Sequence, residues 1–405
     1  MDKPLSGIKV LEVAQWWFVP AAAAVLADWG AEVVKIEHPV TGDPQRGLAA
    51  MGWKSKEGNV DFMMQQSNRG KRSVGIDLAT PGGRELLYRL AKDSDVFVTS
   101  FLPDARRRLQ IDVEHIRAIN PKIIYVRGSG QGPHGPDNEK GGYDATAFWS
   151  RGGVGAVLTP AGADQPVMQR PAFGDSVGAL TLAGGIAAAL LRRERTGVTS
   201  VVDVSLLSTA MWVLGPDIVA CPLVDPSRWM PPYTRAAHFN PVTNAYRTKD
   251  GRWLMLVMLQ ASRHWPDFCR HIDRPDLIDD PRFATDAARF EHREACIAVL
   301  DQVFVSRTLD EWRAKLATME GPWAPMQTPA EIHGDPQAII NGYLPEVDGG
   351  DKGKFRLVAN PVQFDERVPE LSPSPEMGQH TEEVLLALGL SWEEIAALKE
   401  SGAIV

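Results

Sequence analysis

The carboxylate best placed for chemistry in this sequence is Asp175, which follows Phe173 and Gly174 at the start of a segment rich in small residues. A carboxylate at a helix start can accept hydrogen bonds from free backbone N–H groups, and the helix dipole favours its anion. We therefore expect the pKa of Asp175 to be lowered, which keeps the side chain ionised at neutral pH. An ionised carboxylate can attack a thioester carbonyl and form a mixed anhydride, but the same residue can equally be a simple helix cap.

Two loops that follow predicted strands carry residues suited to a ligand pocket. Trp16, Trp17 and Phe18 are adjacent aromatic side chains that can stack on a base, wall a pocket or pack against a neighbouring domain or subunit. Residues 128–132 read Gly-Ser-Gly-Gln-Gly, which lets the backbone approach a ligand closely or forms a plain surface turn. Ligands of open parallel sheets bind at the carboxyl ends of the strands, where both loops are expected.

Two short basic runs indicate a polyphosphate ligand in a chain that is otherwise acidic. Residues 68–73 read Asn-Arg-Gly-Lys-Arg-Ser, and residues 106–108 are all arginine. Such runs hold phosphates by charge and by backbone N–H groups, although many charge runs are simply solvated faces. The sequence has neither a Gly-x-Gly-x-x-Gly fingerprint after the first strand nor a Walker loop, which disfavours a nicotinamide dehydrogenase.

Composition excludes several classes of protein. The 405 residues contain 43 Lys and Arg against 51 Asp and Glu, and a net charge of −8 gives no overall attraction for nucleic acid or an anionic membrane. The three cysteines are too far apart in sequence for a Cys-x-x-Cys metal site, and the nine histidines show no metal-ligand spacing. The longest uncharged apolar stretch, 176–191, is shorter than the ~18 residues of a membrane helix, and no signal peptide is recognisable. We expect a cytoplasmic protein that binds neither nucleic acid nor membrane.

The elements that must position these residues alternate between strand and helix. Short apolar runs predict strands at 8–13, 31–36, 74–78, 95–99 and 122–126. Helices are predicted at 20–29, 82–91 and 175–195. Strands that alternate with helices predict βαβ units, and therefore a doubly wound α/β domain with a mostly parallel sheet covered on both faces.

A second, smaller domain is predicted in the C-terminal half. Six prolines between residues 216 and 241 indicate a linker, because proline interrupts both helices and central strands. Residues 246–259 read as two strands around Asp250-Gly251, which suits a hairpin turn, and three helical stretches follow. We predict a small α+β domain over 225–325, with a large domain made of 1–224 and 326–405.

Short motifs are also spread over almost the whole chain. They include residues 4–12, 26–37, 42–43, 68–73, 76–78, 120–121, 130–131, 142–144, 174–175, 195–197, 246–248, 250–253, 280–283 and 380–385. In order and spacing these motifs resemble the class III CoA-transferase family. That family groups formyl-CoA and carnitine CoA-transferases with α-methylacyl-CoA racemases.

The resemblance implies a fold, a ligand and a set of contacts. The fold would be a large doubly wound α/β domain joined by two linkers to a smaller domain, with two chains interlocked as an obligate homodimer. Coenzyme A, as acyl-CoA, would bind on the large domain, a free carboxylic acid would be the second substrate, and neither a metal nor a redox cofactor is needed. The family's catalytic aspartate falls on Asp175, and Tyr143 would lie near the thioester. By matching position, contacts to the adenine and phosphates would involve Trp16, His38, Lys71, Phe101, Arg108 and Leu109, and Trp17 would join Trp16 in an aromatic acyl pocket.

The implied reaction is CoA transfer through covalent intermediates on Asp175. The carboxylate would form an anhydride with the donor acyl group and then a thioester with CoA, before the acceptor acid receives the CoA. A racemase or epimerase is the alternative within the family, but racemases carry a histidine at the position of Tyr143, and a tyrosine with an ordinary pKa of ~10 is a poor base. His134 could replace that histidine, so this alternative stays open, as does a CoA-binding protein without turnover.

Three features of this chain depart from the family pattern. His38 stands where an arginine is frequent, and Gly141 stands where some transferases have a lysine, which alters the expected phosphate contacts. Residues 229–240 are rich in proline and aromatic residues, where some transferases have a glycine-rich loop over the site. We expect a stiffer cover over the site and a preference for a bulky or apolar acid.

Overall fold

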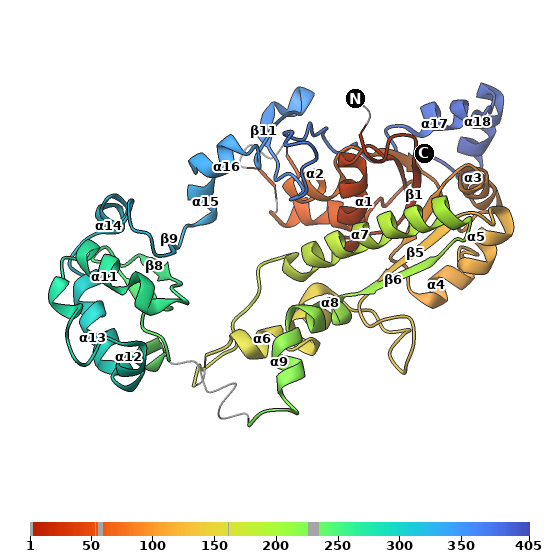
Figure 1. Cartoon of the computed structure of the whole chain (residues 1–405). Helices are drawn as coiled ribbons and strands as arrows, with labels where there is room; N and C mark the ends of the chain where they lie inside the picture. Colours follow the sequence, from red (N-terminus) through yellow and green to blue (C-terminus); the bar gives the residue numbers. More distant parts are fainter. Residues whose placement is uncertain (1–2, 53, 56–59, 161, 226–234) are drawn as a thin grey trace. The chain divides into compact units, whose positions relative to one another are not determined.

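The computed structural model describes residues 3–52, 54–55, 60–160, 162–225 and 235–405 (Figure 1). The chain divides into two compact units. The first unit comprises residues 1–159, 165–222 and 336–405, and the second comprises 160–164 and 223–335. The predicted small domain falls within the second unit, which ends at residue 335 rather than 325.

A six-stranded parallel sheet forms the centre of the first unit. Its strands are β1 (Lys9–Val13), β2 (Glu32–Glu37), β3 (Arg72–Gly75), β4 (Val96–Thr99), β5 (Ile124–Ser129) and β6 (Val201–Ser205). Their order is β3-β2-β1-β4-β5-β6, and every neighbouring pair is parallel. The predicted α/β fold with a mostly parallel sheet is therefore confirmed. The strand order reverses between β1 and β4, which creates the switch point where such sheets bind ligands.

One face of the sheet is covered by α1 (Phe18–Asp28) and α7 (Phe173–Thr196). Successive strand residues point to opposite faces, so alternate positions such as Val10 supply the core on this side. A Cβ added at Gly178 of α7 would lie 2.7 Å from the ring of Phe18, so glycine lets the two helices approach closely. By length and composition alone, α7 could cross a membrane, and 44% of its most apolar window is buried. One side of the helix, with Leu182 and Ile186, belongs to the apolar core of this unit.

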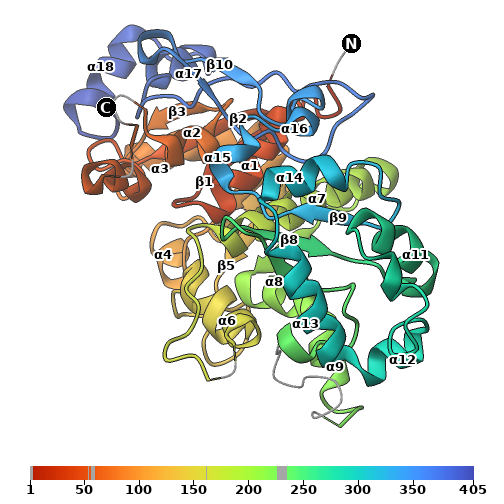
Figure 2. The same cartoon turned by 90° about the vertical axis from the view of Figure 1, so that its left-hand side faces the viewer.

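The other face is covered by α3 (Pro81–Lys92), α5 (Val113–Ile119) and the C-terminal helices α17 (Thr381–Ala387) and α18 (Trp392–Glu400). Strand residues that point this way, such as Leu11, form a second apolar core with them. The two C-terminal helices lie beside α3 in both views (Figures 1 and 2). The end of the chain therefore belongs to the same unit as its beginning.

The remaining elements of the first unit connect or follow the strands. They are the 3-10 helix η1 (Pro44–Met51), α2 (Phe62–Asn68), α4 (Pro103–Arg108), the π-helix η2 (Asp144–Arg151), α6 (Val154–Leu158), α8 (Leu206–Val213), α9 (Gly215–Ala220), α16 (Pro336–Ile340), and the antiparallel pair β10 (Glu346–Asp348) and β11 (Lys354–Arg356) with η5 (Gly350–Lys352) between them. The last helix, α18, starts with a capping box formed by Ser391 and Glu394.

The second unit is built on a three-stranded antiparallel sheet with helices packed around it. Its strands, in sheet order, are β7 (Ala245–Arg247), β8 (Trp253–Leu256) and β9 (Trp323–Pro325). Its helices are η3 (Arg235–Ala237), α11 (Ala261–His271), η4 (Pro275–Leu277), α12 (Asp286–Glu291), α13 (Arg293–Phe304), α14 (Leu309–Lys315) and α15 (Pro329–Ile332). Gly251, in the turn between β7 and β8, has a φ of 76° that favours glycine.

Candidate active site

A pocket of about 400 Å³ lies at the carboxyl ends of β1, β4 and β5, and we call it the switch-point pocket. The loops after these strands supply Trp16, Phe101 and Gly130, and the first turn of α7 supplies Asp175. The other lining residues are Gln15, Phe18, Ser100, Leu102, Ala105, Arg108, Leu109, Gly128, Ser129, Gly141, Gly142, Tyr143 and Leu206. The pocket therefore combines apolar and aromatic walls with one carboxylate.

A second pocket, of about 330 Å³, lies at the carboxyl ends of β1, β2 and β3, and we call it the nucleotide-side pocket. Among its lining residues are His38, which follows β2, and Asp77, which follows β3. Gln15, Phe101 and Leu109 line both pockets. The two cavities thus share one wall at the switch point.

The structure brings most of the predicted site residues to these two pockets. Those that line the switch-point pocket are Trp16, Phe101, Arg108, Leu109, Tyr143 and Asp175. His38 lines the nucleotide-side pocket. Trp17 lines neither pocket, but its indole Nε1–H donates to Ser176 Oγ at 3.2 Å, next to Asp175 in the sequence.

Asp175 does not cap α7, contrary to the expectation from the sequence. The helix starts at Phe173, and its N-cap is Ala172, which has a left-handed φ of 60°. Burial, and then the charge of the nearby Asp144 carboxylate, raise the pKa of Asp175 to about 7. The predicted lowering of this pKa is wrong, because another side chain accepts the hydrogen bonds at the helix start that would have stabilised the Asp175 anion.

That other side chain is Asp144, in the first turn of η2. The backbone N–H of Gly174 donates to both carboxylate oxygens of Asp144 at 3.1 Å. A Cβ added at Gly174 would lie 2.2 Å from the ring of Phe148 and 2.5 Å from Asp144 Oδ1, so only glycine permits this approach. Sequence reasoning missed the cap because 30 positions separate its two partners.

Two glycines, Gly130 and Gly142, bring backbone rather than side chains to the wall of the pocket that Asp175 also lines. A Cβ added at Gly130 would lie 2.5 Å from Cα of Gly142, so the loop after β5 meets the segment before η2 only because both positions are glycine. The carbonyl of Gly130 accepts a hydrogen bond from the backbone N–H of Leu207 at 3.0 Å. This contact fixes the loop against the start of α8.

Trp16 and Tyr143 make an edge-to-face aromatic contact in the wall of the switch-point pocket. Their ring centroids are 5.6 Å apart with an interplanar angle of 87°. Trp16 has a left-handed φ of 68°, which is unfavourable for a residue with a side chain. Its backbone N–H donates to Asp43 Oδ1 at 3.1 Å, so Asp43 helps to hold this conformation.

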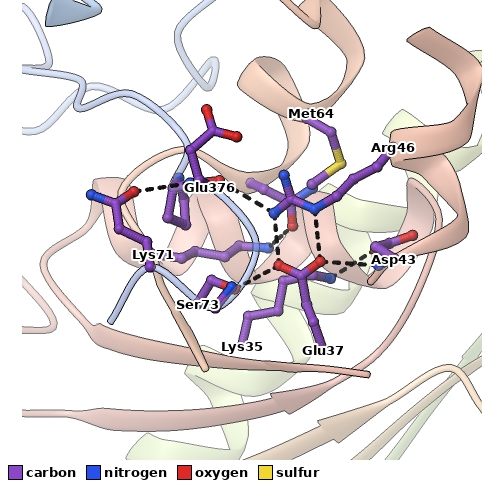
Figure 3. A network of polar contacts seen from close by, with 12 residues as sticks. Lys35, Glu37, Asp43, Arg46, Met64, Lys71, Ser73 and Glu376 are labelled. Carbon is purple, nitrogen blue, oxygen red and sulfur yellow. Dashed lines mark hydrogen bonds and ion pairs between the residues drawn. The ribbon is translucent and has the colours of Figure 1, made fainter. Parts of the chain in front are cut away.

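Asp43 belongs to a buried ion network, which we define as Glu12, Lys35, Glu37, Asp43, Arg46 and Lys71 (Figure 3). Lys35 Nζ lies 2.8 Å from Glu12 Oε1 and 2.9 Å from Asp43 Oδ2, and its side chain is fully buried. The same ammonium donates to the carbonyl of Ala14 at 2.9 Å. Lys35 therefore ties the end of β1 to the carboxylate that holds Trp16. Glu12 and Lys35 are directly opposite on the neighbouring strands β1 and β2, so the register of the sheet brings this pair together.

Lys71 is part of this network and lines neither pocket. Its Nζ lies 2.7 Å from Glu12 Oε2 and donates to the Pro20 carbonyl at 2.8 Å and to Asn68 Oδ1 at 2.9 Å. Burial is the main cause that lowers the pKa of Lys71, to about 8. In the structure Lys71 therefore serves as a buried partner of Glu12, and the phosphate contact that the resemblance implies for it stays a prediction.

Two further expectations concern residues away from these pockets. His134, on which the racemase alternative depends, is exposed and lines neither pocket. The expected stiff cover starts in residues 229–234, which lie outside the described part of the chain. Among the residues that the structure describes, no group of three His, Cys, Asp or Glu side chains could hold a metal ion.

Comparison with known proteins agrees with the fold and gives the family. Residues 5–381 match the model of the family described as CoA-transferase family III. The chain is 34% identical to (R)-2-hydroxy-4-methylpentanoate CoA-transferase of Clostridioides difficile, over 99% of each protein. It is 31% identical to cinnamoyl-CoA:phenyllactate CoA-transferase of Clostridium sporogenes, over 99% of this chain and 97% of that protein. The crystal structure of a CaiB/BaiF family protein from Brucella suis matches with a TM-score of 0.81 and 28% identity, over 96% of this chain and 100% of that one.

A parallel α/β sheet with a carboxylate in the pocket at its switch point, together with these matches, defines an enzyme of the CoA-transferase class. The chain belongs to the class III CoA-transferase family, as its motifs indicate. That family acts on CoA thioesters and carboxylic acids.

Proposed function

We propose that this protein transfers CoA from an acyl-CoA to a free carboxylic acid, with Asp175 as the nucleophile. The observation that carries the proposal is the carboxylate of Asp175 in the wall of the switch-point pocket, which is also lined by the closely packed backbone of Gly130 and Gly142. With a pKa of about 7, the Asp175 anion is more basic than an ordinary aspartate and is still partly ionised at neutral pH. Greater basicity makes it a better nucleophile toward a thioester carbonyl.

The proposed reaction alternates between two kinds of covalent intermediate. An oxygen of Asp175 attacks the donor thioester carbonyl, the C–S bond breaks, and CoA leaves as a thiolate while an acyl anhydride forms. The thiolate attacks the aspartyl carbonyl, which gives an aspartyl-CoA thioester and releases the donor acid as its carboxylate. The acceptor carboxylate attacks that thioester, which forms a second anhydride and again frees the thiolate. The thiolate then attacks the acceptor carbonyl, yielding the new acyl-CoA and the free Asp175 carboxylate.

Each of these additions places negative charge on a carbonyl oxygen. We propose that backbone N–H groups of the loop around Gly130 stabilise that charge, because the loop lies in the same pocket wall as Asp175. The positive end of the α7 dipole adds to this stabilisation. Backbone donors that are fixed before the reaction need no rearrangement when the charge develops.

We propose that the nucleotide of CoA binds in the nucleotide-side pocket and that its pantetheine arm crosses the shared wall toward Asp175. The shared residues Phe101 and Leu109 support this path, because they contact both cavities. His38 and Arg108, one in each pocket, are the residues we expect nearest the phosphates. Binding energy from the nucleotide would then position the thioester at the nucleophile.

We propose that the acid substrates carry a branched or aromatic apolar group. Trp16, Phe18 and Leu206 give the switch-point pocket apolar walls that favour such a group. By their names, two relatives act on 2-hydroxy-4-methylpentanoate and on phenyllactate, which are 2-hydroxy acids with a branched and an aromatic side chain. Acids of that class are the acceptors to examine first.

We also propose that two chains interlock as a homodimer in the cytoplasm. Side chains on α8 and α9 support the dimer, because 85% of Trp212 and 62% of Val219 are exposed on a single chain. The cysteines support a reducing compartment, because Cys221, Cys269 and Cys296 are all free thiols.

The test of the proposed function follows transfer and the covalent intermediate together. Acyl-CoA donors are screened against free acids by mass spectrometry, and hydroxylamine is added during turnover of an active pair. We expect a hydroxamate on Asp175 in the wild type, loss of both transfer and label in Asp175→Ala, and transfer retained in Tyr143→Phe. An active wild type without label at Asp175 would contradict the covalent route, and deuterium uptake at the α-carbon from heavy water would indicate a racemase.

A further inference from the structure

Asp144 is a buried carboxylate beside the switch-point pocket that no step of the proposed reaction uses. Only 6% of the residue is exposed, and it directly follows Tyr143, which lines the pocket. We propose that Asp144 is a positioning residue, which caps α7 in place of Asp175 and whose negative charge makes the free Asp175 carboxylate more reactive. This inference rests on the proposed function of Asp175 as the nucleophile.

The first step concerns the free N–H groups at the start of α7. The N-cap residue, Ala172, has no side-chain oxygen to accept them. The Gly174 N–H donates to both oxygens of Asp144. Burial raises the pKa of Asp144, and the backbone N–H groups of Asp175, Gly174 and Phe173 act against this by stabilising its anion. Because a carboxylate from η2 satisfies these donors, the Asp175 side chain is left to face the pocket.

The second step concerns the fixed approach between η2 and α7. The close contact of Gly174 with the Phe148 ring and with Asp144 leaves little freedom between the two helices. Tyr143, at the N-cap of η2, contacts Trp16, which also lines the pocket. Asp144 therefore fixes the position of the start of η2, which carries Tyr143, relative to the start of α7, which carries Asp175.

The third step concerns charge. The titratable and charged groups that share the pocket wall with Asp175 are Arg108 and Tyr143, and the carboxylate of Asp144 on η2 also acts on its charge. Of these, the negative charge of Asp144 is the one that disfavours ionisation of Asp175. A more basic carboxylate attacks a carbonyl faster once ionised, so Asp144 raises the rate at higher pH and lowers the ionised fraction at lower pH.

The experiment separates the cap from the charge. Asp144→Asn keeps a carbonyl oxygen that can accept the Gly174 N–H but removes the negative charge, whereas Asp144→Ala removes both. Asp93→Asn is the matched control, because Asp93 is an exposed carboxylate at the end of α3, outside the site. For each variant, kcat/KM of CoA transfer is measured across a pH range from about 5.5 to 8.5, which brackets the pKa of Asp175.

We expect Asp144→Asn to be slower than the wild type at high pH and to recover as pH falls. The ratio of its kcat/KM to that of the wild type should rise by about threefold or more as the pH is lowered across the range, because a larger fraction of Asp175 stays ionised in the variant than in the wild type at low pH. Asp144→Ala should lose more activity at every pH, because the cap is lost as well. Asp93→Asn should give the wild-type profile. A constant ratio for Asp144→Asn, or wild-type rates for Asp144→Ala, would overturn the inference.

A second measurement does not depend on transfer. Carbodiimide coupling of Asp175 to an amine, followed by peptide mass spectrometry and normalised to Asp93, reports the protonated fraction of Asp175. We expect half-labelling near pH 7 in the wild type and at lower pH in Asp144→Asn. If labelling shifts as expected while Asp175→Ala still transfers CoA, the proposed function fails and the electrostatic coupling stands. If labelling does not shift, the coupling fails whatever the activity.

Discussion

Two neighbouring carboxylates at the start of α7, those of Asp144 and Asp175, have different roles. Asp144 accepts the backbone hydrogen bonds of the helix start, whereas Asp175 is partly buried in the pocket wall without them. Its pKa of about 7 lies above the usual value for aspartate, so the folded protein favours the protonated form. An ionised Asp175 is therefore the form that reacts and also the form that destabilises the fold.

A stability measurement follows from this at the residue scale. The pKa of Asp175 is about 7 when folded and 3.8 when unfolded, so between these values the folded state holds more protons and its stability falls as pH rises. We expect Asp175→Asn to raise the free energy of unfolding by about 1–3 kcal/mol at about pH 8, and by much less near pH 5. Urea unfolding of both proteins at the two pH values measures the difference. Equal differences at both pH values would contradict the raised pKa.

The sequence alone could predict those site residues whose position depends mainly on the chain segments next to them. Asp175, Trp16 and Tyr143 lie in the pocket wall where the motifs suggested a site. Lys71 was interpreted as a phosphate contact because it stands in a basic run, but its partner Glu12 is on another strand. Asp144 was not predicted as a site residue, because the hydrogen bond that it accepts comes from the N–H group of a distant segment.

At the scale of elements, α7 approaches η2 through Gly174, and this contact offers a mutational test. A Cβ at Gly174 would lie 2.2 Å from the Phe148 ring, whereas a Cβ at Gly184 of the same helix would meet nothing within 4 Å. We expect Gly174→Ala to lower the free energy of unfolding by about 2 kcal/mol or more and to abolish transfer. Gly184→Ala should raise it by about 0.5–1 kcal/mol with activity kept. Thermal and urea unfolding check both, and equal effects would contradict the close approach.

The buried ion network offers a second test among elements, because Lys35 joins β2 to the end of β1. Lys35→Met would remove the positive charge that pairs with the buried carboxylates of Glu12 and Asp43. This loss should lower the free energy of unfolding by about 3–5 kcal/mol. Arg72→Met is the control, since Arg72 lies 3.6 Å from Glu32 in a partly exposed pair between β3 and β2. We expect its effect to stay within about 1 kcal/mol. Urea unfolding distinguishes the two, and similar losses would argue against a special role for the buried charges.

The elements themselves were predictable where their apolar runs were long enough. The predicted strands near β1, β2, β4 and β5 match the structure to within a few residues, and the helix at 175–195 matches α7 (Figure 1). β6 was not predicted, because Val201–Ser205 is short, sits at the sheet edge and carries Asp203. Its place is set by pairing with β5, where Arg127 and Asp203 meet at 2.6 Å. Such pairing between distant segments cannot be read from local pattern.

At the scale of the whole molecule, the exposed apolar side chains of α8 and α9 make the proposed dimer testable. We expect the wild type to sediment as a dimer in analytical ultracentrifugation at micromolar concentration. Trp212→Asp, which replaces the exposed tryptophan of α8 with a charged residue, should shift the protein toward monomer. Phe239→Asp is a comparison variant in the second unit, where 62% of the residue is exposed. A monomeric wild type would contradict the proposed dimer.

Phe101 and Leu109 sit in the partition between the two cavities, and this arrangement limits how selectivity for the acid can change. If CoA spans both cavities as proposed, replacing either side chain to admit a larger acyl group would also weaken the binding of its nucleotide. The switch-point pocket, but not the other cavity, is lined by Trp16, Tyr143 and Leu206. Substitutions at these three positions can therefore change selectivity for the acid without altering the residues that we propose to bind the nucleotide.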